Sequence, residues 1–166
     1  MHIFLRQEYM SLHNTFFAYS SAEEQKYAVD ESNFALGHKF IISQGQTKIA
    51  QISQQSFGFR PNYDIKIGDQ SHTLRRVSNG EEFFYNLSNP NWQITGDIIG
   101  QDYAIIDENN SQVGSVMAKE NTIVGDALDI YTVDPSNEPL LLAIVVAVEA
   151  DCKDYLEKLQ NSTQIG

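Results

Sequence analysis

Histidine and cysteine are the residues of this chain whose chemistry is easiest to recognise, and their spacing does not suggest a site. His2, His13, His38 and His72 are too far apart in sequence to place two ligands on one face of a helix, and Cys152 has no second cysteine near it. His38 and His72 both fall in predicted strands and could converge in the fold. Isolated strand histidines are more often surface or hydrogen-bonded core residues, so we predict no metal and no cofactor.

The familiar catalytic signatures are absent from the sequence. It contains no serine elbow, no phosphate-binding glycine loop and no dinucleotide fingerprint. Cys152 stands near the end of a predicted helix beside Asp151 and Asp154, where the helix dipole and both carboxylates disfavour a thiolate. The acidic stretch 107–111 lacks the central glycine and the distal glutamate of a calcium loop. We therefore predict a protein that is not an enzyme and has no catalytic residues.

Aromatic and cationic residues supply the one local pattern that suggests recognition. Phe57, Phe59 and Arg60 share a predicted connection with a flexible glycine, and this residue mixture is over-represented in interfaces. The same connection can be explained as a plug for one end of the fold. Lys66 and one of the two neighbouring arginines that follow could add positive charge, since alternate residues of a strand face opposite sides. The candidate surface recognition residues are Phe57, Phe59, Arg60, Lys66, Arg75 and Arg76.

The charge balance limits the partners. Lys and Arg total 11 against 22 Asp and Glu, a formal net charge of −11, so phosphate backbones would be repelled unless positive charge is concentrated locally. We expect no nucleic-acid partner. A single cysteine forms no internal disulfide, and residues 1–6 lack the features of a secretion signal. These observations favour the cytoplasm.

A period of two dominates residues 2–133, as expected for strands with one buried face. It is clearest around Tyr63, Ile65 and Ile67, which alternate with polar residues. Turn signals separate about twelve short strands, which favours consecutive hairpins and a sheet that curls or closes. The expected strands are 3–9, 15–20, 25–30, 38–44, 47–54, 62–67, 72–77, 82–87, 92–98, 102–107, 112–118 and 126–133.

A helix is expected over about 137–151. Ser136 or Asn137 can cap it, and Pro139 is tolerated in its first turn. Residues 140–148 are all apolar, so every face of this helix must be buried, yet the run is too short to cross a bilayer, which takes roughly 20 residues. The sheet is the available container. We predict one domain, 1–166: a closed antiparallel β-barrel of about twelve strands around a central apolar C-terminal helix.

A tail of residues 152–166 is expected to lie on the barrel rim as an amphipathic extension. Tyr155, Leu156 and Leu159 would supply its apolar side. Charge pairs four residues apart, Glu149 with Lys153 and Asp154 with Lys158, suit such an extension.

Five sequence segments follow one another in a recognisable order and spacing: Phe34-Ala35-Leu36-Gly37-His38-Lys39-Phe40-Ile41-Ile42, Ile49-Ala50-Gln51-Ile52, Ser56-Phe57-Gly58-Phe59-Arg60-Pro61-Asn62-Tyr63-Asp64-Ile65, Trp92-Gln93-Ile94-Thr95-Gly96-Asp97 and Leu142-Ala143-Ile144-Val145-Val146-Ala147. Together with the order of elements, these segments resemble the LURP-one-related family of the tubby-like superfamily. The resemblance covers nearly the whole chain and implies the same filled barrel.

For function the resemblance gives little. A filled barrel leaves no interior cavity, which favours a non-enzymatic binding or interaction module whose protein or lipid partner is unknown and uses the outer surface, loops or rims. Tubby proteins bind phosphoinositides through a basic pocket, which makes a membrane-surface module the alternative. This chain carries Gln54-Gln55 where relatives often place lysine, and its net negative charge would repel anionic headgroups. A third alternative is an enzyme of unrecognised type, which would require a rim pocket with convergent polar groups.

Overall fold

Alternating apolar and polar residues form twelve antiparallel strands in the computed structural model, which describes residues 1–6, 15–32, 36–56, 61–78, 83–122 and 125–165. Each strand begins within two residues of the start expected from the sequence. The strands are β1 (His2–Arg6), β2 (Thr15–Ser20), β3 (Gln25–Glu31), β4 (Lys39–Gln44), β5 (Thr47–Ser56), β6 (Asn62–Ile67), β7 (Gln70–Ser78), β8 (Phe83–Ser88), β9 (Trp92–Asp97), β10 (Asp102–Ile106), β11 (Gln112–Thr122) and β12 (Gly125–Thr132).

Every strand pairs with its neighbour in sequence, and β1 pairs with β12 to close the barrel. At this closure Ile3 stands opposite Ile130 and Leu5 opposite Leu128, and all four side chains are buried. A one-residue slip would turn these side chains to the outside, so their apolar character fixes the register of the closing pair. The predicted closed antiparallel barrel is confirmed.

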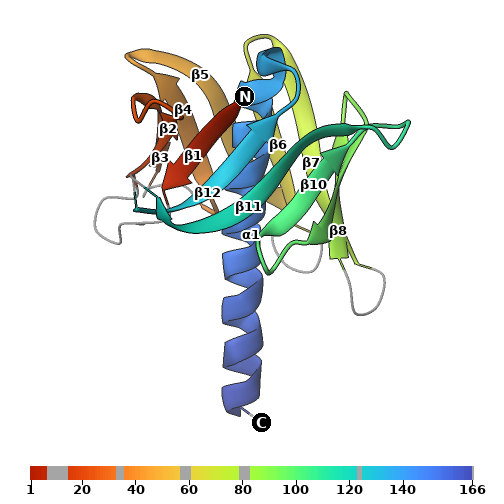
Figure 1. Ribbon diagram of the computed structural model, residues 1–166. Coiled ribbons are helices and arrows are strands. Elements are labelled where there is room, and N and C mark those ends of the chain that lie inside the picture. The colour runs from red at the N-terminus through yellow and green to blue at the C-terminus, as the bar shows by residue number, and fades with distance from the viewer. Residues whose placement is uncertain (7–14, 33–35, 57–60, 79–82, 123–124, 166) are drawn as a thin grey trace.

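The apolar run forms the first part of α1 (Glu138–Ile165), which passes through the barrel (Figure 1). Residues 140–148 are all buried, and the inward side chains of the strands pack around them in one hydrophobic core. The helix is preceded by the short 3-10 helix η1 (Pro135–Asn137), which is capped by the side chain of Asp134 through the backbone N–H of Ser136. The predicted central helix is confirmed.

Close packing between wall and helix is visible at Gly114 of β11. A Cβ atom at this position would collide with the side chain of Leu141 and with the carbonyl oxygen of Tyr131. Only glycine therefore allows the strand to approach the helix this closely.

The far end of α1 differs from the expected boundaries, which placed a helix over about 137–151 and a tail over 152–166 on the rim. The helix instead continues without a break to Ile165 and projects from the barrel (Figure 1). Leu156 and Leu159 are 39% and 45% exposed. Residues 149–165 contain no glycine or proline, and a helix already formed inside the barrel extends at little cost through good helix formers. The charges from residue 149 onward mark the barrel mouth and not the helix end.

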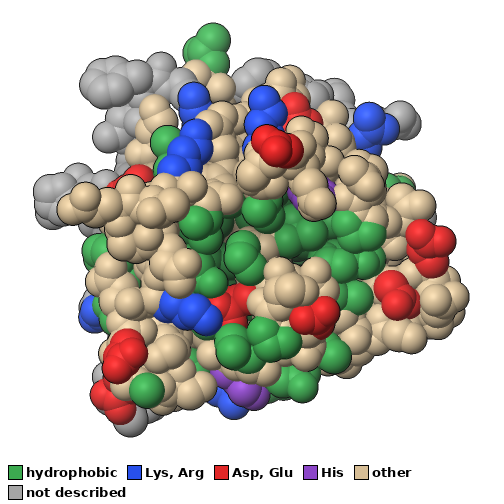
Figure 2. All heavy atoms as spheres, turned by 90° about the horizontal axis from the view of Figure 1, so that it is seen from above, with side chains coloured by type: hydrophobic (Ala, Val, Ile, Leu, Met, Phe, Trp, Pro, Cys, Tyr) green, Lys and Arg blue, Asp and Glu red, His purple; other side chains and the backbone are tan. Residues whose placement is uncertain are grey.

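We call the mouth where α1 begins the entry end and the mouth where it leaves the exit end. Glu138 lies buried at the entry end, where its Oε1 is 2.5 Å from Nζ of Lys26 and accepts a 2.8 Å hydrogen bond from the hydroxyl of Tyr27. Figure 2 shows this end from outside, with hydrophobic side chains gathered around a central hollow. Among the described residues, no helix has the length and hydropathy needed to cross a bilayer.

Candidate functional site

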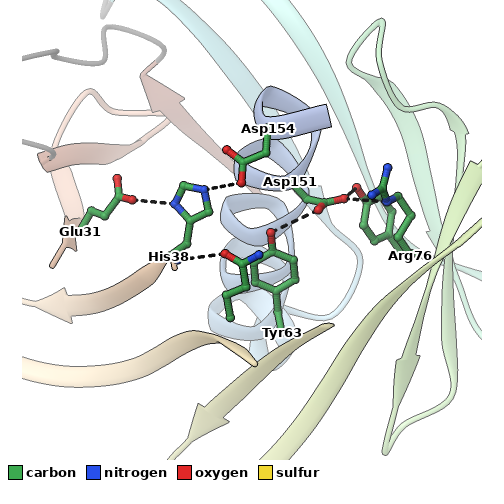
Figure 3. A network of polar contacts seen from close by, with 8 residues as sticks. Glu31, His38, Tyr63, Arg76, Asp151 and Asp154 are labelled. Atoms are coloured by element: carbon green, nitrogen blue, oxygen red, sulfur yellow. Dashed lines mark hydrogen bonds and ion pairs between the residues drawn. The ribbon is translucent and has the colours of Figure 1, made fainter. Parts of the chain in front are cut away.

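A buried carboxylate dominates the exit end. Asp151 of α1 is 3% exposed, and its Oδ2 accepts a 2.5 Å hydrogen bond from the hydroxyl of Tyr85, while its Oδ1 accepts one of 3.3 Å from Tyr63. Nε of Arg76 lies 3.2 Å from the same Oδ2 (Figure 3). β6, β7 and β8 thus each contribute one donor to a single residue of the helix.

The electrostatics of this cluster follow from its burial. Desolvation raises the pKa of Asp151, and the hydrogen bond from Tyr85 and the charge of Arg76 oppose that rise. Burial also raises the pKa values of Tyr63 and Tyr85, so both hydroxyls keep their protons and donate. This carboxylate is almost fully buried, and both of its oxygens accept hydrogen bonds from the barrel. We interpret the cluster as a polar anchor between helix and wall.

Arg76 has its guanidinium against two aromatic rings at the rim of this cluster. Its Cζ lies 4.9 Å from the ring centre of Tyr155 on α1 and 5.6 Å from that of Phe83 on β8. Cation–π contacts of this kind add to the ion pair with Asp151. Arg76 therefore holds the helix in place.

His38 forms a second link between the wall and the helix at the exit end. Its Nδ1 lies 2.7 Å from Oε1 of Glu31, and its Nε2 lies 2.8 Å from Oδ2 of Asp154 (Figure 3). The hydrogen bonds to Asp154 and Glu31 raise its pKa to about 9, against some desolvation, so the imidazole is positively charged at neutral pH. A charged histidine between two carboxylates binds the end of β3 to α1.

Glu149 and Cys152 complete the helical side of the mouth. Glu149 accepts hydrogen bonds from Gln101 (2.8 Å) and Tyr103 (3.0 Å), and burial raises its pKa. Cys152 is buried beside Tyr85, and desolvation raises the pKa of its thiol to about 12, which disfavours the reactive thiolate. The expected pairs of Glu149 with Lys153 and Asp154 with Lys158 do not form, because both carboxylates are bound to residues of the barrel.

Histidine chemistry is dispersed in the structure. His38 lies at the exit end, whereas His72 is buried on β7 and bonds through Nδ1 to the backbone carbonyl of Asn89, so the two do not converge. His13 lies outside the described residues. Within the described ranges, no three His, Cys, Asp or Glu side chains come together as metal ligands.

The candidate recognition residues separate into three groups. Phe57, Phe59 and Arg60 lie outside the described residues. Arg76 points to the exit end, while Lys66 and Arg75 are exposed on the outer wall. Arg75 stands opposite Asn62 and Lys66 opposite Ser71, so the two cations are four positions apart along the paired strands, roughly 13 Å. Asp64 faces outward between them, and the structure brings no cation pair together here.

A groove of about 740 Å³ lies on the outer wall over β7, β8 and β9. Arg75, Asn86 and Gln93 contribute side chains to it, and Asp107 and Glu108 of the turn between β10 and β11 form one border. Sequence reasoning identified Arg75 but missed the two amides. Only the strand register, which places Asn86 opposite both Arg75 and Gln93, reveals the set.

The family model described as LURP-one-related matches residues 1–149. The chain belongs to the LURP-one-related family. The resemblance expected from the sequence is thus confirmed. The family match ends at Glu149, the helical residue that binds Gln101 and Tyr103 at the mouth.

One sequence relative and one solved structure match nearly all of this LURP-one-related protein. The uncharacterized protein YxjI of Bacillus subtilis is 23% identical over 156 residues, which are 92% of this chain and 93% of the relative. The X-ray structure of a protein from Arabidopsis thaliana matches 89% of this chain and 90% of its own, with a TM-score of 0.59 and 12% identity. The second match supports the fold alone. Neither the family description nor the relatives' names indicate catalysis.

Proposed function

We propose that this LURP-one-related protein is a non-enzymatic binding module that meets its partner on the outside of the barrel. The observation that carries the proposal is the position of α1. Residues 140–148 occupy the barrel interior, where other barrels hold a ligand. The surfaces that remain for a partner to bind are the outer wall and the rims of the barrel.

The chemistry of the exit end supports binding over catalysis. Asp151 and Glu149 already accept hydrogen bonds from the protein, and the Cys152 thiol is buried. A catalytic acid, base or nucleophile needs access to a substrate. In the described part of the mouth these groups support the structure instead. We also propose the cytoplasm as its compartment, in keeping with the single free cysteine.

The experiment that tests this function is site-specific photo-crosslinking in the native cell. A photoreactive amino acid replaces Asn86 in the outer groove, and in a matched control it replaces Met117, an exposed residue of β11. We expect a discrete adduct from position 86 and none from position 117. If positions around the groove and both rims give no adduct in cells that express the protein, the binding function is wrong.

A membrane surface is the second candidate partner, favoured by the exposed cations Lys66 and Arg75. Against it stand Asp64 between them and the net charge of −11. Sedimentation with phosphatidylserine vesicles tests it, since binding through these cations would weaken as salt screens the charges. Vesicles that leave the protein in the supernatant at low salt would exclude this candidate.

A further inference from the structure

The outer groove contains a row of polar side chains that crosses three neighbouring strands. Arg75 of β7 stands opposite Asn86 of β8, Asn86 opposite Gln93 of β9, and Gln93 opposite Ile106 of β10. Residues opposite each other in an antiparallel sheet point to the same face. Arg75, Asn86 and Gln93 therefore form a continuous ladder on the outside of the barrel.

The ladder has opposite charges at its two ends. It begins at the guanidinium of Arg75 and leads to the turn after Ile106, where Asp107 and Glu108 border the groove. Oδ1 of Asp107 accepts hydrogen bonds from the backbone N–H groups of Asn109 and Ser111, which fixes the turn. Glu108 is exposed beside it. The groove is thus positive at one end, negative at the other and lined by amides between.

These groups are available to a ligand. In the described part of the chain, the side chains of Arg75, Asn86, Gln93 and Glu108 have no hydrogen bond or ion pair within the protein. This contrasts with Arg76, the next residue, which is bound to Asp151. The ladder's hydrogen-bonding groups face the groove.

The length of the ladder suggests the size of the ligand. Adjacent strands lie about 4.8 Å apart, so the three steps from β7 to β10 span roughly 14 Å. An extended polypeptide advances about 3.3 to 3.6 Å per residue, so about four residues bridge the two charged ends. A volume of about 740 Å³ lies within the roughly 300 to 1,000 Å³ range of ligand sites.

The closed barrel determines how such a chain would be recognised. Peptides often bind by adding a strand to a free sheet edge, but every strand here has two neighbours. The main-chain groups of a bound peptide must then form hydrogen bonds with side chains of the groove. The side-chain amides of Asn86 and Gln93 each offer both a donor and an acceptor.

We propose that this groove binds an extended peptide segment with an acidic group against Arg75 and a basic group against Glu108, with about two residues between the two charged residues. The inference rests on the proposed binding function and names its partner class. The acidic group is a carboxylate, from either an acidic side chain or a chain terminus.

The test uses nuclear magnetic resonance of the ¹⁵N-labelled protein with synthetic peptides. Blocked Lys-Ala-Ala-Glu and Glu-Ala-Ala-Lys are compared with an all-alanine peptide of equal length. We expect saturable shifts of the Asn86 and Gln93 side-chain amide signals with at least one mixed-charge peptide and none with the alanine peptide. A third arm, Lys-Ala-Ala with a free carboxylate, tests whether a chain terminus supplies the acid.

Charge reversal in the protein provides the decisive control. Arg75→Glu should weaken binding of the mixed-charge peptide by roughly tenfold or more. The same variant should prefer a peptide with lysine at both ends. Glu108→Lys should shift preference to a peptide with glutamate at both ends. Both residues are exposed, so neither variant should disturb folding. Unchanged preference in both variants would overturn the proposal, and so would the absence of saturable shifts with every charged peptide.

Failure of this inference can be told apart from failure of the proposed function. Crosslinks from position 86 in cells, combined with no peptide binding, would reject the peptide class and keep the binding function. Vesicle binding that Arg75→Glu abolishes, without peptide binding, would likewise reject the peptide and indicate a lipid headgroup.

Discussion

At the scale of single residues, the exit end is held by charges that come from distant parts of the chain. His38 joins Glu31 on the wall to Asp154 on the helix, and Arg76 joins β7 to Asp151. Each link fixes the helix to the wall at a position where the apolar core has already ended. These side chains therefore fix α1 to the wall beyond the end of the apolar core.

The His38 link should make stability depend on pH. Folding raises the pKa of His38 from 6.5 to about 9, so the native state binds the proton more tightly than the unfolded chain. The stabilisation is complete below about pH 6.5 and is lost as pH rises through about 9. We expect His38→Gln to lower the free energy of unfolding by about 1 to 2 kcal/mol at neutral pH, with most of the difference gone at alkaline pH.

Urea unfolding of both proteins across this pH range measures the effect. Trp92 is the single tryptophan and is buried in the core, so its fluorescence reports global unfolding. A gap between the two proteins that stays constant with pH would show that the protonated imidazole contributes nothing.

Little of this residue-scale chemistry could be predicted from the sequence. His38 and Asp154 are 116 positions apart, and Tyr85 and Asp151 are 66 apart. Such pairings depend on the strand order and on the depth of the helix, which periodicity does not give. Arg75 and Arg76 were predicted to face opposite sides, as they do, but the sequence did not indicate which one would be buried.

At the scale of elements, the central helix is the component on which the barrel depends. Val145 lies in the middle of its apolar run and is fully buried. Val145→Asp places a charge where no partner exists, so we expect the folded state to lose more than about 4 kcal/mol. Val133→Asp is the matched control, because Val133 is 53% exposed and should change stability by about 0.5 kcal/mol or less. Urea unfolding of the two variants measures the difference, and equal stability would contradict the buried-helix arrangement.

The elements themselves were largely predictable. Alternation in the strands and the unbroken apolar run at 140–148 are local signals, and both survive in the structure. The end of the helix was not predictable by the same reasoning. The charges at Glu149 and Asp151 mark the edge of an apolar core in sequence, but barrel tyrosines bind both carboxylates inside the mouth.

At the scale of the whole molecule, closure of the barrel joins the first strand to the last. Removing residues 1–6 would free the edges of β2 and β12. It would also expose the part of the core against which Ile3 and Leu5 pack. Exposed edges template pairing between chains, so we expect this truncation to form large assemblies. Removing residues 157–166 is the matched control, because the side chains of 157–162 are exposed. Size-exclusion chromatography with light scattering compares both with the full chain, and a β1 truncation that elutes like the control would refute the role of closure.

The order of elements along the chain has a consequence for synthesis. All twelve strands precede α1 in the sequence, so they emerge from the ribosome before the helix that fills the barrel. Until residues 140–148 emerge, the inward faces of the strands have nothing to pack against. A nascent chain that ends before residue 140 should expose the apolar inner face of the strands. Chaperones and proteases recognise exposed apolar surface of this kind. The barrel can therefore complete its core only after translation has passed residue 148.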